Sequence, residues 1–167
     1  MAGTISPGDA IDAIHSILTS DLPAKLDALD TEYSSTGDEV LADLVKIWKS
    51  PIERFQENPG ASLVSSGFAR LEEVGHNIYD VFVTLVVNLS HGNVSTGSLS
   101  PAELLTQQIQ RTIRGAAEVI LSKRTLSVSS VNNADFVYLD EVRLGFVPGE
   151  NTLTQRAEMD FRVRVSV

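Results

Sequence analysis

The chain of 167 residues contains no cysteine, so it has neither disulfides nor thiolate ligands for a metal. It also lacks a long apolar run, because the longest one, residues 81–87, is interrupted by Thr84. A helix needs roughly 20 apolar residues to cross a bilayer. The first residues lack the basic and apolar stretches of a secretion signal. We therefore expect a soluble protein, made in a reducing cytoplasm, with no membrane partner.

Residues suited to catalysis are also scarce. There are three histidines, His15, His76 and His91, and neither a glycine-rich phosphate loop nor a Gly-x-Ser-x-Gly turn. Glu73 and His76 have the Glu-x-x-His spacing of helical metal sites, but they fall in a predicted hairpin. His15 lies on the polar side of a predicted helix, where solvent or an interface is the expected environment. We therefore expect no catalytic residue, no metal ligand, no cofactor and no enzymatic activity.

The formal net charge is −9, and its distribution is uneven. Residues 1–45 carry nine acidic residues and a single basic one, Lys25, whereas the remainder is nearly neutral. An acidic surface argues against DNA binding, which needs clustered Lys and Arg to contact the phosphates. Two interpretations stay open: a solvated helix face, or a surface that meets a basic partner or repels DNA passing close by. The acidic candidates are Asp27, Asp30, Glu32, Asp38 and Glu39.

The first helix is marked by its start. Ser6 can cap it, Pro7 suits the first helical position, and Asp9 is placed to complete a capping box. Apolar residues at helical spacing then predict a helix over residues 7–29. Because proline lacks an N–H group, we expect this helix to be bent or divided near Pro23.

Residues 31–37 form a predicted loop, and residues 38–55 are ambiguous. Their apolar side chains match the stripe of a helix that Pro51 would end. The stripe comprises Leu41, Leu44, Val45 and Trp48. We interpret residues 32–60 as a variable loop or insertion. Trp48, the only tryptophan, is expected to pack in the core or at its edge rather than in an interface.

From residue 61 onward the pattern is that of a sheet with one helix. Strands are predicted over residues 61–71, 78–89, 136–146 and 153–167, the last two as a possible hairpin. The last strand alternates strictly, with polar side chains between apolar ones. The apolar ones are Met159, Phe161, Val163, Val165 and Val167. Because such a strand at a sheet edge would promote aggregation, we expect a neighbouring subunit to cover it.

The long helix of this block is predicted over residues 100–123. Ser100, Pro101 and Glu103 repeat the capping pattern, and Lys123 suits the carboxyl end of a helix. A broad apolar stripe is formed by Leu104, Leu105, Ile109, Ile113, Ala116, Ala117, Ile120 and Leu121. Gly115 inside a helix costs about 1 kcal/mol relative to alanine, and close packing on the sheet would explain it.

These elements predict an α+β fold: a mostly antiparallel sheet packed against a long helix, with an additional N-terminal helix. We expect a single domain over residues 1–167, with an N-terminal helical segment (1–31), the variable insertion (32–60) and a sheet-helix-sheet core (61–167). Three arginines, Arg143, Arg162 and Arg164, fall on its exposed sheet face. They are either scattered surface charge, or a basic strip that meets the acidic segment of a neighbouring subunit and sets the register of an oligomer.

Several short motifs occur in a fixed order along the chain. They are Asp21-Leu22-Pro23-Ala24-Lys25-Leu26 and Asp30-Thr31-Glu32-Tyr33 in the first helix, the strand from His76 to Val83, and Arg111-Thr-Ile-Arg114 in the long helix. A variable loop and a Ser/Gly-rich strand lie between the first helix and His76, and alternating strands complete the chain. In this order and spacing, over nearly its whole length, the sequence resembles the tail terminator, or tail completion, proteins of tailed bacteriophages and related particles.

The resemblance implies a structural virion protein of the tail or neck, made in the host cytoplasm. It implies a homo-oligomeric ring, usually of six subunits, that caps the tail tube. One face would contact the tail tube protein and the other the neck or connector protein. DNA would pass through the lumen as non-specific cargo, and carboxylates lining the lumen would repel its phosphates.

Three alternatives stay open. Another neck component, such as a head-closure or connector-adaptor protein, is the nearest. A tail tube protein is less favoured, because tube subunits are mostly sheet and this chain is predicted to be about one third helix. A small-molecule enzyme with a sheet-and-helix fold would need a polar pocket with convergent titratable groups.

Overall fold

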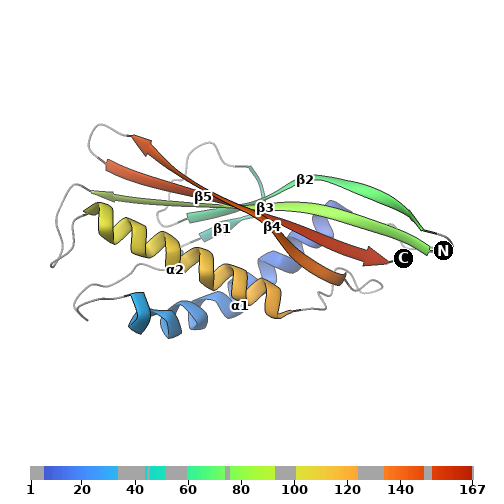
Figure 1. Ribbon diagram of the computed structural model, residues 1–167, viewed down its shortest axis with the longest axis horizontal. Coiled ribbons are helices and arrows are strands. Elements are labelled where there is room, and N and C mark those ends of the chain that lie inside the picture. Colours follow the sequence, from blue (N-terminus) through green and yellow to red (C-terminus); the bar gives the residue numbers. More distant parts are fainter. Residues whose placement is uncertain are drawn as a thin grey trace.

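The computed structural model describes residues 6–33, 44, 46–51, 60–73, 76–92, 101–123, 134–148 and 152–166. Within these segments Figure 1 shows helices and strands in two layers. In chain order the elements are α1 (Pro7–Tyr33), β1 (Lys46–Trp48), β2 (Gly60–Glu73), β3 (His76–Gly92), α2 (Pro101–Ser122), β4 (Ala134–Pro148) and β5 (Thr152–Ser166). Both helices lie on one side of the sheet (Figure 1). We name this side the helix face and the opposite side the outer face.

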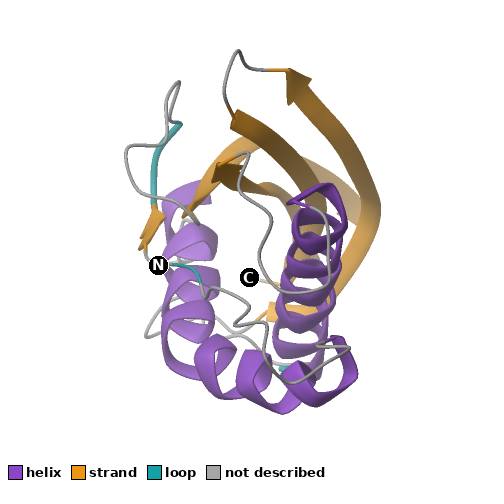
Figure 2. Cartoon of the chain, turned by 90° about the vertical axis from the view of Figure 1, so that its left-hand side faces the viewer, coloured by secondary structure: helices purple, strands orange, loops and turns teal. Residues whose placement is uncertain are grey.

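Among the described residues the sheet contains five strands, in the order β1-β2-β3-β5-β4. The β1–β2 pairing is parallel, and the other three pairings are antiparallel. The expected α+β class is therefore confirmed. The sheet, predicted to be mostly antiparallel, is mixed, with three antiparallel pairings and one parallel pairing among the described residues. Seen from the end, the sheet curves and the two helices lie beside it (Figure 2). Two helices, not one long helix alone, cover the helix face, with α2 contacting β3, β4 and β5 and α1 contacting β2 and β3.

The core forms between the helices and the alternating residues of β3 and β5. Directly paired residues of antiparallel strands point to the same face. Val83 pairs with Phe161 and Leu85 with Met159, and all four side chains are at most 1% exposed. The predicted hairpin of the last two strands and the period-2 pattern of the last one are confirmed.

The expectation for the position of the last strand is wrong in one respect. β5 lies inside the sheet, between β3 and β4, so its backbone is paired on both sides within the chain. No neighbouring subunit is needed to cover it. The strand at the sheet edge is β4, and β1 lies at the opposite edge. Strand order depends on contacts between distant segments, which a local alternation pattern does not encode.

Helix α1 begins as the capping pattern predicts. The backbone N–H of Ser6 donates to Oδ2 of Asp9 at 3.0 Å, and the N–H of Gly8 donates to Oγ of Ser6 at 3.2 Å. Pro23 lies inside the helix, where it removes the hydrogen bond to the carbonyl of Thr19. α1 is accordingly a single bent helix (Figure 1).

Two expectations for the following segment are corrected. α1 continues to Tyr33, so residues 31–33 are helical rather than the start of a loop. Residues 46–48 form strand β1 and not a helix, because they pair in parallel with residues 60–62 of β2. A helical stripe is identified from neighbouring residues alone, and the pairing partner of residues 46–48 is more distant along the chain. The remainder of the predicted stripe, except Leu44, lies outside the described residues.

Strand β1 is also held from the helix side. Nε2 of His15 lies 3.1 Å from the carbonyl oxygen of Ile47, a contact in which the ring nitrogen donates. His15 therefore connects α1 to β1, which corrects the expectation that it faces solvent or an interface. Trp48 is half-buried on this edge strand, as expected for edge packing, and the Nζ of Lys46 lies 5.3 Å from its ring centroid.

Helix α2 matches its predicted bounds closely. Most of its apolar stripe is buried, but Leu121 is 38% exposed and does not belong to the core. The reason proposed for Gly115 is wrong. A Cβ at this position would lie 2.9 Å from Cδ2 of Leu26 and 3.2 Å from Cδ1 of Leu22. Gly115 therefore allows α2 to approach α1, not the sheet.

Candidate interaction surfaces

The outer face of the sheet carries a dense arrangement of charges. Asp80 of β3 pairs in register with Arg164 of β5, and Arg162 pairs with Tyr138 of β4. The side chain of Asp80 is only 5% exposed. It accepts hydrogen bonds from Nε and Nη2 of Arg164, at 2.8 and 3.0 Å, in a bidentate arrangement.

Arg162 extends this cluster toward β4. Its Nη1 lies 3.8 Å from Oδ2 of Asp80, and its Nη2 donates to Oδ1 of Asp140 at 3.1 Å. The guanidinium groups of Arg162 and Arg164 lie 4.8 and 5.9 Å from the ring centroid of Tyr138. One connected polar network therefore joins Asp80 of β3, Tyr138 and Asp140 of β4, and Arg162 and Arg164 of β5.

The third arginine lies in a separate group. Nη1 of Arg143 is 2.8 Å from Glu141, and its Nη2 is 3.3 Å from Glu158 and 2.8 Å from Asp160. The charge of Asp160, followed by those of Glu141 and Glu158, raises the pKa of Arg143 above its usual range. Phe82 and Thr84 complete a shallow depression of about 450 Å³ beside these residues. Arg143, Arg162 and Arg164 therefore share the outer face as predicted, but carboxylates of the same sheet neutralise each of them.

The acidic N-terminal segment is likewise paired within the chain. Asp30 and Glu32 of α1 form ion pairs with Arg111 and Arg114 of α2. Lys25 pairs with Glu118, Asp21 with Lys123, and Asp12 with Lys49. These cross-element ion pairs reduce the acidic surface that the distribution of charge along the chain suggests.

Of the acidic candidates, Asp27 is exposed on α1, whereas Asp30 and Glu32 belong to the seam between the helices. Asp38 and Glu39 lie outside the described residues. Hydrogen bonds from Ser20 and Lys123 lower the pKa of Asp21. Hydrogen bonds from Lys25 and Arg114 lower the pKa of Glu118.

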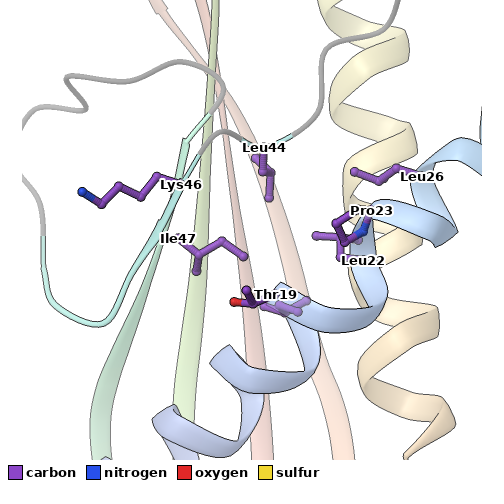
Figure 3. Close-up of a pocket in the computed structure, with 8 residues that line it drawn as sticks. Thr19, Leu22, Pro23, Leu26, Leu44, Lys46 and Ile47 are labelled. Carbon is purple, nitrogen blue, oxygen red and sulfur yellow. The ribbon is translucent and has the colours of Figure 1, made fainter.

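A small apolar cavity of about 110 Å³ lies between α1 and strand β1 (Figure 3). Five of its lining residues come from the bend of α1, and three come from the segment around β1. They are Leu18, Thr19, Leu22, Pro23, Leu26, Leu44, Lys46 and Ile47. The bend at Pro23 and the edge position of β1 together leave this space.

Among the side chains whose burial the structure describes, two apolar ones are exposed at the opposite edge of the sheet. Val142 and Leu144 of β4 are 38% and 54% exposed. They pair with Met159 and Ala157, which are buried on the helix face, so Val142 and Leu144 point to that same face. The alternation of Val142 with Leu144 is visible in the sequence. Their exposure, however, depends on how far α2 extends over β4 on the helix face.

Across the segments that the structure describes, no group of three or more His, Cys, Asp or Glu residues is placed to hold a metal ion. In the same segments, neither α1 nor α2 is long and apolar enough to cross a membrane.

No protein-family model matches the sequence, and no curated protein matches it. Among solved structures, the fold is similar to that of a chain from the "Virion of native gene transfer agent (GTA) particle". The TM-score is 0.53 at 13% sequence identity, and the match covers 89% of this chain and 99% of that chain. The two chains therefore share an α+β fold over nearly their whole lengths.

Proposed function

We propose that this protein is a structural virion protein, and specifically a tail terminator that forms a ring on the end of a tail tube and joins it to the neck. The observation that carries the proposal is the fold shared with a chain of a gene transfer agent virion, over 89% of this chain and 99% of that one. The order of motifs along the sequence independently resembles tail terminators. The resemblance in sequence and the similarity in fold therefore support the same class of particle.

The surfaces of the molecule support an assembling protein. The outer face presents a network of alternating charges from β3, β4 and β5, which suits recognition of a partner by charge pattern. Edge strand β4 exposes apolar side chains, and apolar side chains exposed on one patch commonly mark a contact surface.

The proposal that the lumen repels DNA rests on the net charge of the chain and not on the N-terminal acidic residues as a group. The chain carries a formal charge of −9, so a ring of it would repel DNA phosphates in passage. Among the expected lumen residues, Asp27 is the described carboxylate that stays exposed without serving the seam between the helices. We propose Asp27, together with Asp38 and Glu39, as lumen-facing candidates.

The alternative within the same class is a head-closure or connector-adaptor protein. Both proposals predict a ring in the neck, and they differ in its position. A terminator lies directly on the last ring of the tube protein, whereas an adaptor lies against the portal under the head.

The test is the position of the protein in particles, determined by electron cryo-microscopy, together with deletion of its gene. We expect a ring directly above the tail tube, and heads separated from tails in the deletion strain. Because a cap stops further addition to the tube, the deletion should also give tails of irregular length. A ring against the portal would favour the adaptor, and absence of the protein from purified particles would overturn both.

DNA binding gives a second measurement. The isolated protein is expected to bind duplex DNA weakly at low salt, because its net charge is negative. A tight and strongly salt-dependent affinity would contradict passage of DNA through a repelling lumen.

A further inference from the structure

The two edges of the sheet carry complementary features on the same face. At one edge, Leu144 and Val142 of β4 project from the helix face and are 54% and 38% exposed. At the other edge, Ile47 of β1 pairs with Ala61, which is fully buried on the helix face. Ile47 lines the apolar cavity beneath the bend of α1 (Figure 3). One edge therefore presents an apolar projection and the other an apolar recess.

The sizes of the two features agree. An apolar cavity of roughly 150 Å³ holds one benzene-sized group. The cavity at β1, at about 110 Å³, suits a single branched aliphatic side chain. Leucine has this size, and Leu144 is the more exposed of the two apolar residues on β4.

We propose that β4 of one copy of this chain adds to β1 of the next copy, so that Leu144 enters the cavity lined by Ile47 and Leu22. This inference rests on the proposed ring and names the surfaces that would build it. β4 and β1 are the two end strands of the sheet in the described residues, so their outer edges are where another strand can add. A contact between two different surfaces of identical subunits is heterologous and closes into a ring when the rotation between subunits allows it.

Charges on the outer face fit the same pairing. Lys46 of β1 is exposed, and it pairs with Gly60 on the outer face. On β4, Asp140 and Glu141 are exposed beside the outer-face network. Adding β4 next to β1 would bring these carboxylates toward Lys46. The occupant that fits both faces is therefore a second copy placed head to tail.

The short length of β1 sets the expected strength of the contact. Only three residues of β1 are available for backbone pairing, so the apolar insertion must supply much of the affinity. A single such contact is weak, and closure of the ring makes the last contact intramolecular. We therefore expect assembly to be steeply dependent on concentration or on a tail tube as template.

Disulfide trapping tests this contact directly, because the chain has no cysteine of its own. Ile47→Cys and Leu144→Cys are made as separate single variants and mixed in equal amounts under mild oxidation. The mixture should give a covalent dimer containing one copy of each variant, and neither variant alone should do so. The double variant should give a ladder of covalent multimers. A disulfide needs Cβ atoms within about 3.5–4.5 Å, so trapping reports close contact.

Leu121→Cys, mixed with Ile47→Cys, is the matched control, because Leu121 is also apolar and 38% exposed but lies on α2. It should give no dimer. A second measurement uses charge: Leu144→Asp should weaken self-association at least about tenfold by sedimentation, while Leu121→Asp should not. Circular dichroism establishes that each variant is folded.

The outcomes separate this inference from the proposed function. If native mass spectrometry detects rings, but Ile47→Cys and Leu144→Cys do not cross-link and Leu144→Asp assembles normally, this contact is wrong and the ring is built by other surfaces. If particles contain the protein in no ring at all, the proposed function fails with it. Homodimers formed by Leu144→Cys alone would show a symmetric contact between two β4 strands and would also overturn the inference.

Discussion

The Nε atom of Arg111 on α2 lies 2.7 Å from Oδ1 of Asp30 on α1, and it also donates a 3.2 Å hydrogen bond to the carbonyl oxygen of Leu26. Arg111 is 1% exposed, while the side chain of Asp30 is 41% exposed. A guanidinium buried this deeply needs polar partners, and the Asp30 carboxylate and the Leu26 carbonyl oxygen lie beside its Nε atom. The contact holds the second half of α1 against α2.

Removing this guanidinium should destabilise the protein strongly. Arg111→Ala removes the side-chain donor to the Leu26 carbonyl and leaves a cavity between the helices, so we expect a loss of about 3 kcal/mol or more in the free energy of unfolding. Urea denaturation of the variant and the parent measures this loss in the free energy of unfolding. Arg114→Ala is the control, because Arg114 is 40% exposed and its ion pairs are screened, and it should cost at most about 1 kcal/mol. Equal costs for both variants would contradict the central role of Arg111.

Gly115 should reject a larger side chain. Gly115→Val places atoms against Leu22 and Leu26, which are at most 2% exposed and have little room to move, so we expect destabilisation of about 2 kcal/mol or more. Gly115→Ala should lie within about 1 kcal/mol of the parent, because gained helix propensity offsets crowding. Gly145→Val is the matched control, since a Cβ there meets nothing within 4 Å of the described atoms. Thermal unfolding of the three variants tests the order.

Asp80 should be the most sensitive acid on the outer face. Asp80→Ala leaves Arg164 and Arg162 without their shared buried carboxylate, so we expect a loss of about 3 kcal/mol. Glu141→Ala changes an exposed partner of Arg143 and should cost less than about 1 kcal/mol. Hydrogen exchange at the β3–β5 pairing provides the readout. Unchanged protection in Asp80→Ala would show that the network contributes little.

Acid should weaken the seam between the helices. The folded-state pKa values of Asp21 and Glu118 are lowered, so the unfolded chain binds protons first as the pH falls through their ordinary values of 3.8 and 4.5. Stability contributed by these groups is therefore present above that window and is lost as the pH falls through the folded pKa values. Glu118→Gln should show a shallower loss of stability between about pH 5 and about pH 3 than the parent. High salt should reduce the difference, because these groups are exposed.

Local patterns were sufficient for several elements. The capping sequence at Ser6 and Asp9 predicted the start of α1, and Pro23 predicted its bend. The alternation from Met159 to Val165 predicted a strand with one buried face. Each of these features depends on residues within a few positions of one another, where hydrogen-bond geometry and side-chain direction follow directly from sequence.

Contacts between distant segments of the chain could not be predicted from those local patterns. Residues 46–48 carry the spacing of a helix but form strand β1, because β2 offers a pairing edge. The N-terminal acids suggest an open acidic surface, but Asp30 and Glu32 are paired with Arg111 and Arg114. The outer-face role of Asp80 was missed entirely, since its partner Arg164 is 84 residues away.

The sequence by itself determined both helices, the four long strands, the buried face of the last strand, and the absence of thiol chemistry. Only the tertiary structure decided the strand order, the partner of Gly115, the pairing of the charges, and the two edges that Leu144 and Ile47 occupy. The physical reason is the range of the interactions. Periodicity and capping act over one or two turns, whereas strand order and ion pairing are selected by packing among segments far apart in the chain.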